Sequence, residues 1–174
     1  MRGALLARLA FWPTLGWNVL LGRVLKVRNW WDRVDEFVVL GALPFRSDVA
    51  RLAACGVRGV VNTCAEYAGP QAEYQAAGIE QLRIPTTDFT PPSLPDVERA
   101  VEFMQRFAER GETVYVHCKA GRARSATVVL CWLVAHRGLA PAAAQQLLLS
   151  KRPHVNRRLL EREVVGQFVA LCGS

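Results

Sequence analysis

The sequence VYVHCKAGRARS, residues 114–125, decides the fold and the chemistry of this chain. Its apolar, β-branched first half predicts a buried strand, and the glycine-containing half that follows predicts a loop leading into a helix. In such a strand, loop and helix start, backbone N–H groups converge on one point and can bind a dianion there. We therefore predict a phosphate-binding loop between a strand and a helix.

Three side chains of this stretch carry the predicted chemistry. Five residues separate Cys118 from Arg124, whose guanidinium can bind two phosphate oxygens at once. The loop amides and the arginine favour the thiolate, so they lower the pKa of Cys118 from about 8.5 by several units and make it a nucleophile at neutral pH. Ser125 can hydrogen-bond the thiolate and help it leave when water attacks the covalent intermediate.

Outside this stretch, short apolar segments alternate with segments of helical period. Strands are predicted at 37–40, 59–61, 79–84 and 113–117, and helices at 97–108, 126–135, 141–149 and 159–171, the first of them begun by a cap at Ser93. This alternation predicts one α/β domain of three layers, in which helices cover both faces of a mostly parallel sheet.

Composition narrows the class of protein. A chain of 174 residues, 51% of them apolar, has room for one core and is too apolar to be disordered. Its five cysteines show no CxxC spacing, which excludes a disulfide scaffold and a zinc site and favours a reducing compartment. The net charge of +7 is concentrated in residues 1–31 and 119–174, and basic regions of this kind seek anions.

Residues 1–31 are predicted to form a membrane-association arm on a catalytic domain at 32–174. The uncharged run 9–22, broken by Pro13, is shorter than the about 20 residues that span a bilayer. After the proline, one face of a predicted interfacial helix carries Trp17, Leu20, Leu21, Val24 and Leu25. Tryptophans at 12, 17, 30 and 31 suit the headgroup region. The alternatives are a helix packed on the domain's own core and a targeting peptide.

The stretch 117–125 resembles the His-Cys-x5-Arg-Ser/Thr signature of protein-tyrosine and dual-specificity phosphatases. Residues 11–15, 39–44, 66–67, 78–83 and 118–122 are similar to the phosphatidylglycerophosphate phosphatases of the mitochondrial tyrosine-phosphatase-like type. This resemblance implies a protein-tyrosine-phosphatase-like fold, a phosphorylated lipid as substrate, an anionic inner membrane as partner and a role in cardiolipin synthesis. It implies no metal or other cofactor.

The same resemblance implies an aspartate on a mobile loop as proton donor to the leaving alcohol. Asp88 fits, because it follows a predicted strand and precedes the proline-stiffened stretch 89–92. The only near rival is Asp96, whose place at a helix start gives it a capping role.

The loop itself supplies the predicted phosphate site, made of Lys119, Ala120, Gly121, Arg122, Ala123 and Arg124. Lys119 and Arg122 add two cations beyond Arg124, and a substrate with a second phosphate would use them. The alternative is that both side chains only tune the thiolate or face solvent.

Two further segments carry hypotheses. Residues 64–66 resemble the phosphatase-and-tensin-homologue lipid phosphatases, which implies that Cys64 forms a reversible disulfide with Cys118 under oxidation and protects it. The basic stretch 151–158 resembles a loop that positions water or substrate in dual-specificity enzymes. We predict that it faces acidic lipid, the alternative being a solvated loop.

Rival functions share the same catalytic residues. A phosphatase of phosphotyrosine or phosphoserine proteins and a phosphoinositide phosphatase are the open alternatives. A nucleic-acid substrate is not expected, because Trp132 and Phe168 are the only aromatic residues of the basic region 119–174. We expect a monomer bound at an inner membrane, mitochondrial in a eukaryote or the cell's own in a bacterium.

Overall fold

A five-stranded sheet with strand order β1-β2-β5-β3-β4 forms the centre of the molecule. The structure is a computed structural model that describes the backbone of residues 2–173 and the side chains of residues 11–173. Strands β2 (Val38–Gly41), β5 (Thr113–His117), β3 (Val57–Cys64) and β4 (Glu80–Thr86) are parallel to their neighbours, and β1 (Trp31–Arg33) pairs antiparallel with β2. The predicted mostly parallel sheet is confirmed.

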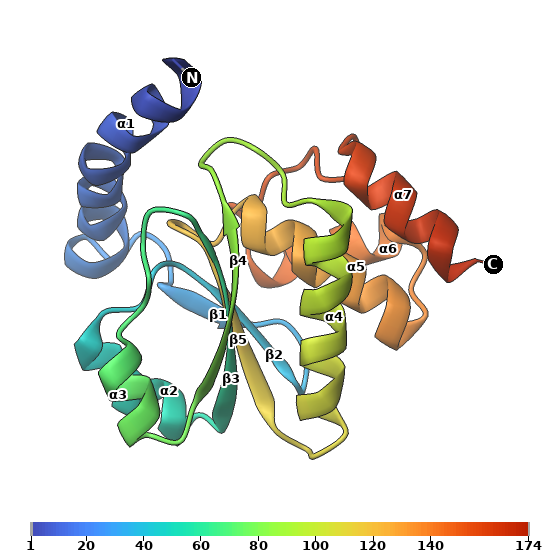
Figure 1. Ribbon diagram of the computed structural model, residues 1–174, viewed down its shortest axis with the longest axis horizontal. Helices are drawn as coiled ribbons and strands as arrows, with labels where there is room; N and C mark the ends of the chain where they lie inside the picture. The colour runs from blue at the N-terminus through green and yellow to red at the C-terminus, as the bar shows by residue number, and fades with distance from the viewer. Residues whose placement is uncertain (1, 174) are drawn as a thin grey trace.

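Helices cover both faces of this sheet (Figure 1). Helices α2 (Val49–Ala54) and α3 (Gln71–Ala76) lie on one face, and α4 (Leu94–Ala108), α5 (Arg124–Arg137), α6 (Pro141–Lys151) and α7 (Glu163–Cys172) lie on the other. Successive strand residues point to opposite faces, so Val114 and Val116 belong to the larger core under α4 and α5 while Tyr115 belongs to the smaller one. The three-layer α/β prediction is therefore correct.

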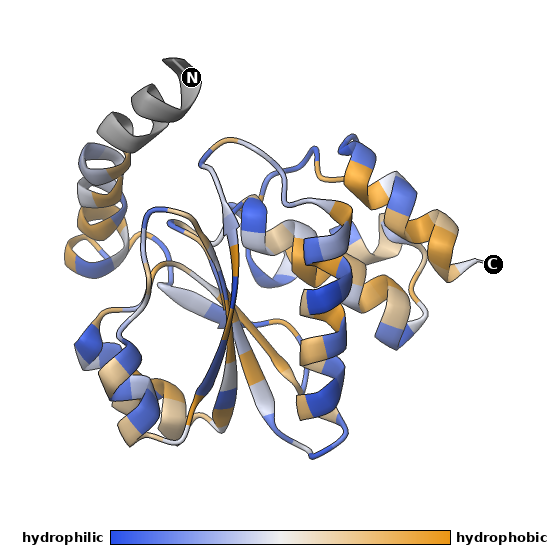
Figure 2. Ribbon diagram, viewed as in Figure 1, coloured by the Kyte–Doolittle hydropathy of each residue, from blue (hydrophilic) through white to orange (hydrophobic). Residues whose placement is uncertain are grey.

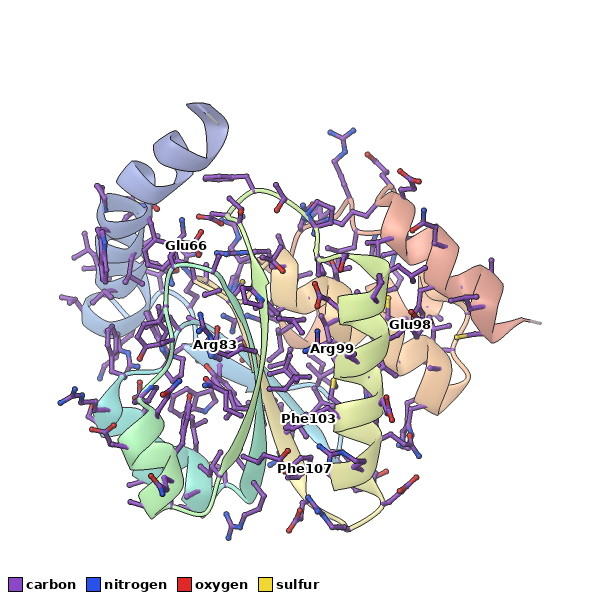
Figure 3. The ribbon with its side chains drawn as sticks, viewed as in Figure 1. Glu66, Arg83, Glu98, Arg99, Phe103 and Phe107 are labelled. Carbon is purple, nitrogen blue, oxygen red and sulfur yellow. The ribbon has the colours of Figure 1, made fainter. Side chains whose placement is uncertain are left out.

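Helix α4 shows how the sequence builds the larger core. Its start is capped by Ser93, whose hydroxyl accepts the N–H of Asp96, as predicted. Phe103 and Phe107 point from the helix toward the strands (Figure 3). They lie over Gly59 of β3, where a Cβ atom would come within 3.0–3.1 Å of the two rings. The glycine thus lets the helix pack closely on the sheet.

The predicted elements all exist, with some differences at their ends. Strand β1 and helices α2 and α3 were not predicted, because three and six residues are too few to show a period. The last helix begins at Glu163 rather than at 159, since Arg162 is extended and its guanidinium donates to Thr127 Oγ1 at 2.9 Å.

The N-terminal arm is helical from Arg2 onward. Helix α1 (Arg2–Val19) continues through Pro13 and is followed by a short π-helix, η1 (Leu20–Val24), so the predicted break at Pro13 is wrong. Phe11 and Leu15, on either side of the proline, pack together against Leu43 and hold the helix in place. The side chains of Arg2 and Arg8, which belong to the predicted basic arm, lie outside the described residues.

The four arm tryptophans separate into two pairs. Trp12 and Trp17 are 65% and 61% exposed, as a lipid-facing role requires. Trp30 is buried and donates its indole N–H to Leu43 O at 3.0 Å, and Trp31 packs edge-on against Tyr115. Placing Trp30 and Trp31 among lipid headgroups was therefore wrong, because the domain itself covers them.

Apolar residues, orange in Figure 2, recur along the described part of the arm. Besides the two exposed tryptophans, Leu20, Val24, Leu25 and Val27 are exposed. Among residues 2–173, no helix combines the length and the apolar character needed to cross a bilayer.

Candidate active site

The phosphate loop lies at the carboxyl ends of β5, β3 and β4 and leads into α5. Parallel α/β sheets commonly bind ligands at this end of their strands. Gly121 sits at the crossing of the loop over β2, with φ +65° and its missing Cβ only 2.4 Å from Gly41 O. Both the backbone angle and the lack of space require glycine here.

Cys118 lies at the bottom of the loop, 4% exposed. Its Sγ accepts the N–H of Gly121 and the hydroxyl of Ser125, each at 3.2 Å. Burial alone would raise the pKa of Cys118, but the Arg124 charge and hydrogen bonds from Ser125 and the loop amides outweigh it and lower that pKa to about 6. The thiol is therefore ionised at neutral pH, as the sequence predicted.

Arg124 is held rigidly by a second layer of groups. Its Nη1 donates to Thr86 O at 2.7 Å and to Glu66 Oε2 at 3.0 Å, and its Nη2 lies 3.0 Å from Asp88 Oδ1. Only 2% of the side chain is exposed. Glu66, in the segment after β3, was not predicted to take part in the site.

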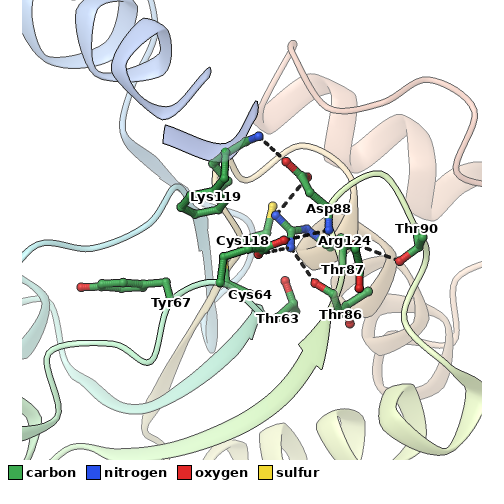
Figure 4. A network of polar contacts seen from close by, with 12 residues as sticks. Thr63, Cys64, Tyr67, Thr86, Thr87, Asp88, Thr90, Cys118, Lys119 and Arg124 are labelled. Carbon is green, nitrogen blue, oxygen red and sulfur yellow. Dashed lines mark hydrogen bonds and ion pairs between the residues drawn. The ribbon is translucent and has the colours of Figure 1, made fainter. Parts of the chain in front are cut away.

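Asp88 lies between two cations (Figure 4). One carboxylate oxygen contacts Arg124, and the other contacts Lys119 Nζ. Its backbone N–H donates to Glu66 Oε1 at 2.9 Å, and the next residue, Phe89, has a left-handed backbone with φ 68°. The structure thus brings Asp88 beside the loop, with Glu66 fixing both Asp88 and Arg124.

Lys119 connects the loop to the arm. Its Nζ lies 2.7 Å from Thr14 Oγ1 of α1 and between the rings of Phe11 and Phe89, 5.3 Å from each centroid. Asn18 of α1 donates to Lys119 O at 3.2 Å. The ammonium that was predicted to meet a second phosphate is therefore already engaged by Asp88 and Thr14, and the arm packs directly on the catalytic loop.

Arg152 supports the loop from below. It is 1% exposed, pairs with Asp32 Oδ2 at 2.5 Å, and donates to Gly121 O at 2.9 Å and to Ala120 O at 3.1 Å. The prediction that the basic stretch 151–158 faces lipid is wrong for this residue, because its buried charge binds Asp32 and the backbone carbonyls of the loop.

A pocket of about 670 Å³ opens above the loop. Asp88 is the one carboxylate among the described residues that line it. Besides Lys119 and Arg124, its lining includes four arginines, namely Arg28, Arg122, Arg157 and Arg162, and two exposed aromatic residues, Trp17 and Phe89. The pocket therefore suits an anionic molecule with an apolar part.

Two more residues of the predictions lie close to the nucleophile. His117 is fully buried, and burial lowers its pKa to about 3, so it is neutral. Cys64 ends β3 next to β5, where burial raises its pKa well above the usual value. Both Cys64 and Cys118 are free thiols, and the protective disulfide stays a prediction. Within residues 11–173, no three His, Cys, Asp or Glu side chains gather as metal ligands would.

Comparison with known proteins agrees with this geometry. Residues 38–164 match the family of the dual specificity phosphatase catalytic domain. The chain is 44% identical over 167 residues to the phosphatidylglycerophosphate phosphatase PTPMT2 of Arabidopsis thaliana, a match that covers 94% of this chain and 73% of that protein. It is 40% identical to the phosphatidylglycerophosphatase and protein-tyrosine phosphatase 1 of Rattus norvegicus, over 94% and 89% of the two chains.

Solved structures give the same result. The crystal structure of PTPMT1 in complex with PI(5)P superposes with a TM-score of 0.76 at 34% sequence identity, covering 83% of this chain and 97% of that one. The strand, loop and helix around Cys118 thus belong to a phosphoric monoester hydrolase. This chain is a member of the dual-specificity phosphatases and, within them, of the family of phosphatidylglycerophosphate phosphatases.

Proposed function

We propose that this enzyme removes the terminal phosphate of phosphatidylglycerophosphate at the surface of an anionic membrane, producing phosphatidylglycerol for cardiolipin synthesis. The observation that carries the proposal is Cys118, with its lowered pKa, in a phosphate loop whose neighbouring residues line a pocket together with arginines. Exposed aromatic residues of the arm and of the Asp88 loop also line this pocket. The similarity to phosphatidylglycerophosphate phosphatases supports phosphatidylglycerophosphate as the substrate.

Cys118 is the proposed nucleophile. The thiolate attacks phosphorus, the bond to the leaving alcohol breaks, and a phosphocysteine forms. Arg124 and the loop amides of residues 119–124 bind the three non-bridging oxygens. Water then attacks the phosphocysteine and releases phosphate, and the Ser125 hydroxyl stabilises the departing thiolate through the contact at 3.2 Å.

Asp88 is the proposed general acid and then the base. Its protonated form gives the leaving alkoxide a proton, and the resulting carboxylate takes a proton from the attacking water. Because Asp88 Oδ1 lies 3.0 Å from Arg124 Nη2, a bound phosphate shares or takes over this contact. Glu66 is a positioning residue, since it holds both Arg124 and the Asp88 backbone.

Residues 1–31 are the proposed membrane arm on the catalytic domain 32–174. Exposed Trp12, Val24 and Leu25 have no core to bury them, and burying such side chains in the lipid interface is favourable. Trp17 both lines the pocket and is exposed, so an exposed apolar side chain of α1 borders the pocket. A lipid headgroup could then enter while its acyl chains stay in the bilayer.

A phosphoinositide is the second candidate substrate. The related PTPMT1 structure was solved in complex with PI(5)P, which, like phosphatidylglycerophosphate, carries a phosphomonoester and a phosphodiester. The two candidates differ in the polar group between these phosphates.

The test measures phosphate release from phosphatidylglycerophosphate, PI(5)P and a phosphotyrosine peptide, with the lipids in anionic vesicles. We expect phosphatidylglycerophosphate to give the highest kcat/KM. A higher value for the peptide would overturn the lipid proposal, and a higher value for PI(5)P would favour the second candidate.

The arm is tested separately with the triple substitution Trp12→Ser, Val24→Ser and Leu25→Ser. Deleting the arm would be uninformative, because α1 contacts the phosphate loop. The triple variant should lose most of its binding to anionic vesicles, whereas the matched control Leu171→Ser, at an exposed leucine of α7, should bind like the wild type. Equal vesicle binding by all three proteins would rule out the arm as the membrane contact.

A further inference from the structure

About half of the arginines with described side chains have an acidic partner, and half of those without one line the pocket. Nine of the arginines with described side chains form ion pairs, namely Arg23, Arg46, Arg99, Arg106, Arg110, Arg124, Arg137, Arg152 and Arg158. Eight others within residues 11–173 pair with no carboxylate, and four of these line the one pocket above the phosphate loop.

Arg28 and Arg122 are the most telling members of this group. Arg28 comes from the segment between η1 and β1, and Arg122 comes from the phosphate loop, so distant parts of the chain bring two like charges together. Burial, followed by the charges of Arg122 and Arg152, lowers the pKa of Arg28. Arg152 is satisfied by Asp32 and by loop carbonyls, which leaves the charges of Arg28 and Arg122 without an anion.

The position of Arg122 is fixed although its charge is not neutralised. Its Nε donates to His154 O at 2.8 Å, and its own carbonyl accepts the N–H of Asn156 at 2.8 Å. These contacts use one of its N–H groups and leave the two terminal nitrogens for a ligand. Holding the half-buried charge of Arg28 near the exposed like charge of Arg122 is unfavourable, and an anion bound between them would relieve this repulsion.

We propose that Arg28 and Arg122 form a second anion subsite, which binds the phosphodiester of a substrate whose phosphomonoester lies over Cys118. The inference rests on the proposed function, because both candidate lipids carry these two phosphates. In this subsite Arg28 of the arm takes the role that was predicted for Lys119, because the Lys119 ammonium is paired with Asp88. The arm thus contributes directly to substrate recognition as well as to membrane contact.

The test uses soluble headgroup mimics, so that it is independent of vesicles. Glycerol 1,3-bisphosphate and glycerol 3-phosphate each compete with 4-nitrophenyl phosphate, and their inhibition constants are compared. We expect the wild-type enzyme to have an inhibition constant about tenfold lower for the bisphosphate, because one charge-assisted contact contributes a preference of this size. In Arg28→Gln and Arg122→Gln the ratio of the two constants should fall toward one, and in Arg28→Lys it should fall less.

Arg51→Gln is the matched control, since Arg51 is exposed, has no carboxylate partner and lies far from the pocket on α2. It should keep the wild-type ratio, and thermal melting should show that every variant is folded. A ratio near one in the wild type, or a ratio unchanged by both arginine substitutions, would overturn the subsite.

Lipid phosphates of the bilayer could attract the same cations. A second experiment therefore distinguishes bilayer phosphates from the phosphodiester of the substrate. Binding to phosphatidylglycerol vesicles is measured for Arg28→Gln and Arg51→Gln. We expect equal binding. If Arg28→Gln alone lost vesicle binding while keeping the bisphosphate preference, Arg28 would contact the bilayer and the subsite would be wrong. A bisphosphate preference without turnover of phosphatidylglycerophosphate would instead sustain the subsite and overturn only the proposed function.

Discussion

The phosphate loop and the outer wall of the pocket both present arginines, but with opposite surroundings. Arg124 and Arg152, at the loop, are 2% and 1% exposed and are bound by carboxylates and backbone carbonyls. The wall includes Arg157 and the side chain of Arg122, whose backbone belongs to the loop. Both side chains are exposed and pair with no acid in the described part of the chain. A buried charge needs partners to be tolerated, whereas a wall charge near water can stay unpaired until a ligand arrives.

The arginines at the loop and those at the wall are therefore expected to act on different parts of the substrate. Groups fixed in the loop act on the phosphorus atom, so changing them should affect every substrate. Groups at the wall should affect only substrates with a second anionic group. Substitutions in the loop test the first half of this comparison, and substitutions of Arg28 and Arg122 test the second.

The largest effect is expected for Cys118→Ser. A serine hydroxyl is scarcely ionised at neutral pH, so phosphate release from all substrates should fall on the order of 10⁴-fold or more. Vesicle binding should persist, because the arm is unchanged. Appreciable residual turnover by a folded variant would refute the nucleophile assignment.

Asp88→Asn should reduce kcat by about 10²- to 10⁴-fold for a lipid substrate. The loss should be smaller for 4-nitrophenyl phosphate, whose leaving group needs little protonation. Asp96→Asn is the control, since Asp96 lies in the first turn of α4, and both of its rates should stay within about twofold of the wild type. Equal losses on the two substrates would identify another acid.

Glu66→Gln should lower kcat/KM by about ten- to a hundredfold on lipid and aryl substrates alike, because one charge-assisted contact to Arg124 is lost. The matched variant Glu73→Gln breaks the exposed pair with Arg46 and should change kcat/KM less than twofold, or about 0.4 kcal/mol. If only lipid substrates lost activity, Glu66 would act on the second anionic group, as the wall residues do. The distinction between loop and wall would then be wrong.

The smallest effect is expected for Ser125→Ala, and it concerns the pH at which the Cys118 thiol ionises. The thiolate exists above the pKa of about 6, and losing the Ser125 hydrogen bond should raise that midpoint by about one pH unit. Alkylation by iodoacetamide should therefore slow at pH 6 and be nearly unchanged at pH 8.5. An unchanged midpoint would show that Arg124 and the loop amides suffice.

Local patterns explain what could be predicted from the sequence. The strand, loop and helix around Cys118 follow from residues 114–125 alone, and helix α4 follows from its period and its Ser93 cap. The three-layer fold followed because β-branched segments alternate with helical ones.

Contacts between distant segments explain the rest. Glu66 meets Arg124 across 58 positions, and Arg152 meets Asp32 across 120, so no spacing rule could pair them. Arg152 looked like any residue of a basic run, and its burial depends on the loop that it supports. Trp30 likewise resembled a lipid-facing residue, because composition near the arm cannot tell an indole in the core from one in the interface.

The most direct test of the account is to trap the covalent intermediate on its proposed substrate. The wild-type enzyme would be mixed with phosphatidylglycerophosphate in anionic vesicles, quenched in acid within milliseconds and mapped by peptide mass spectrometry. Asp88 is kept, because its proton is needed to release the lipid alcohol and form the intermediate. We predict one phosphoryl group on Cys118, formed from this lipid and absent with phosphatidylglycerol. Phosphate on another residue, or turnover with Cys118 never phosphorylated, would contradict the mechanism.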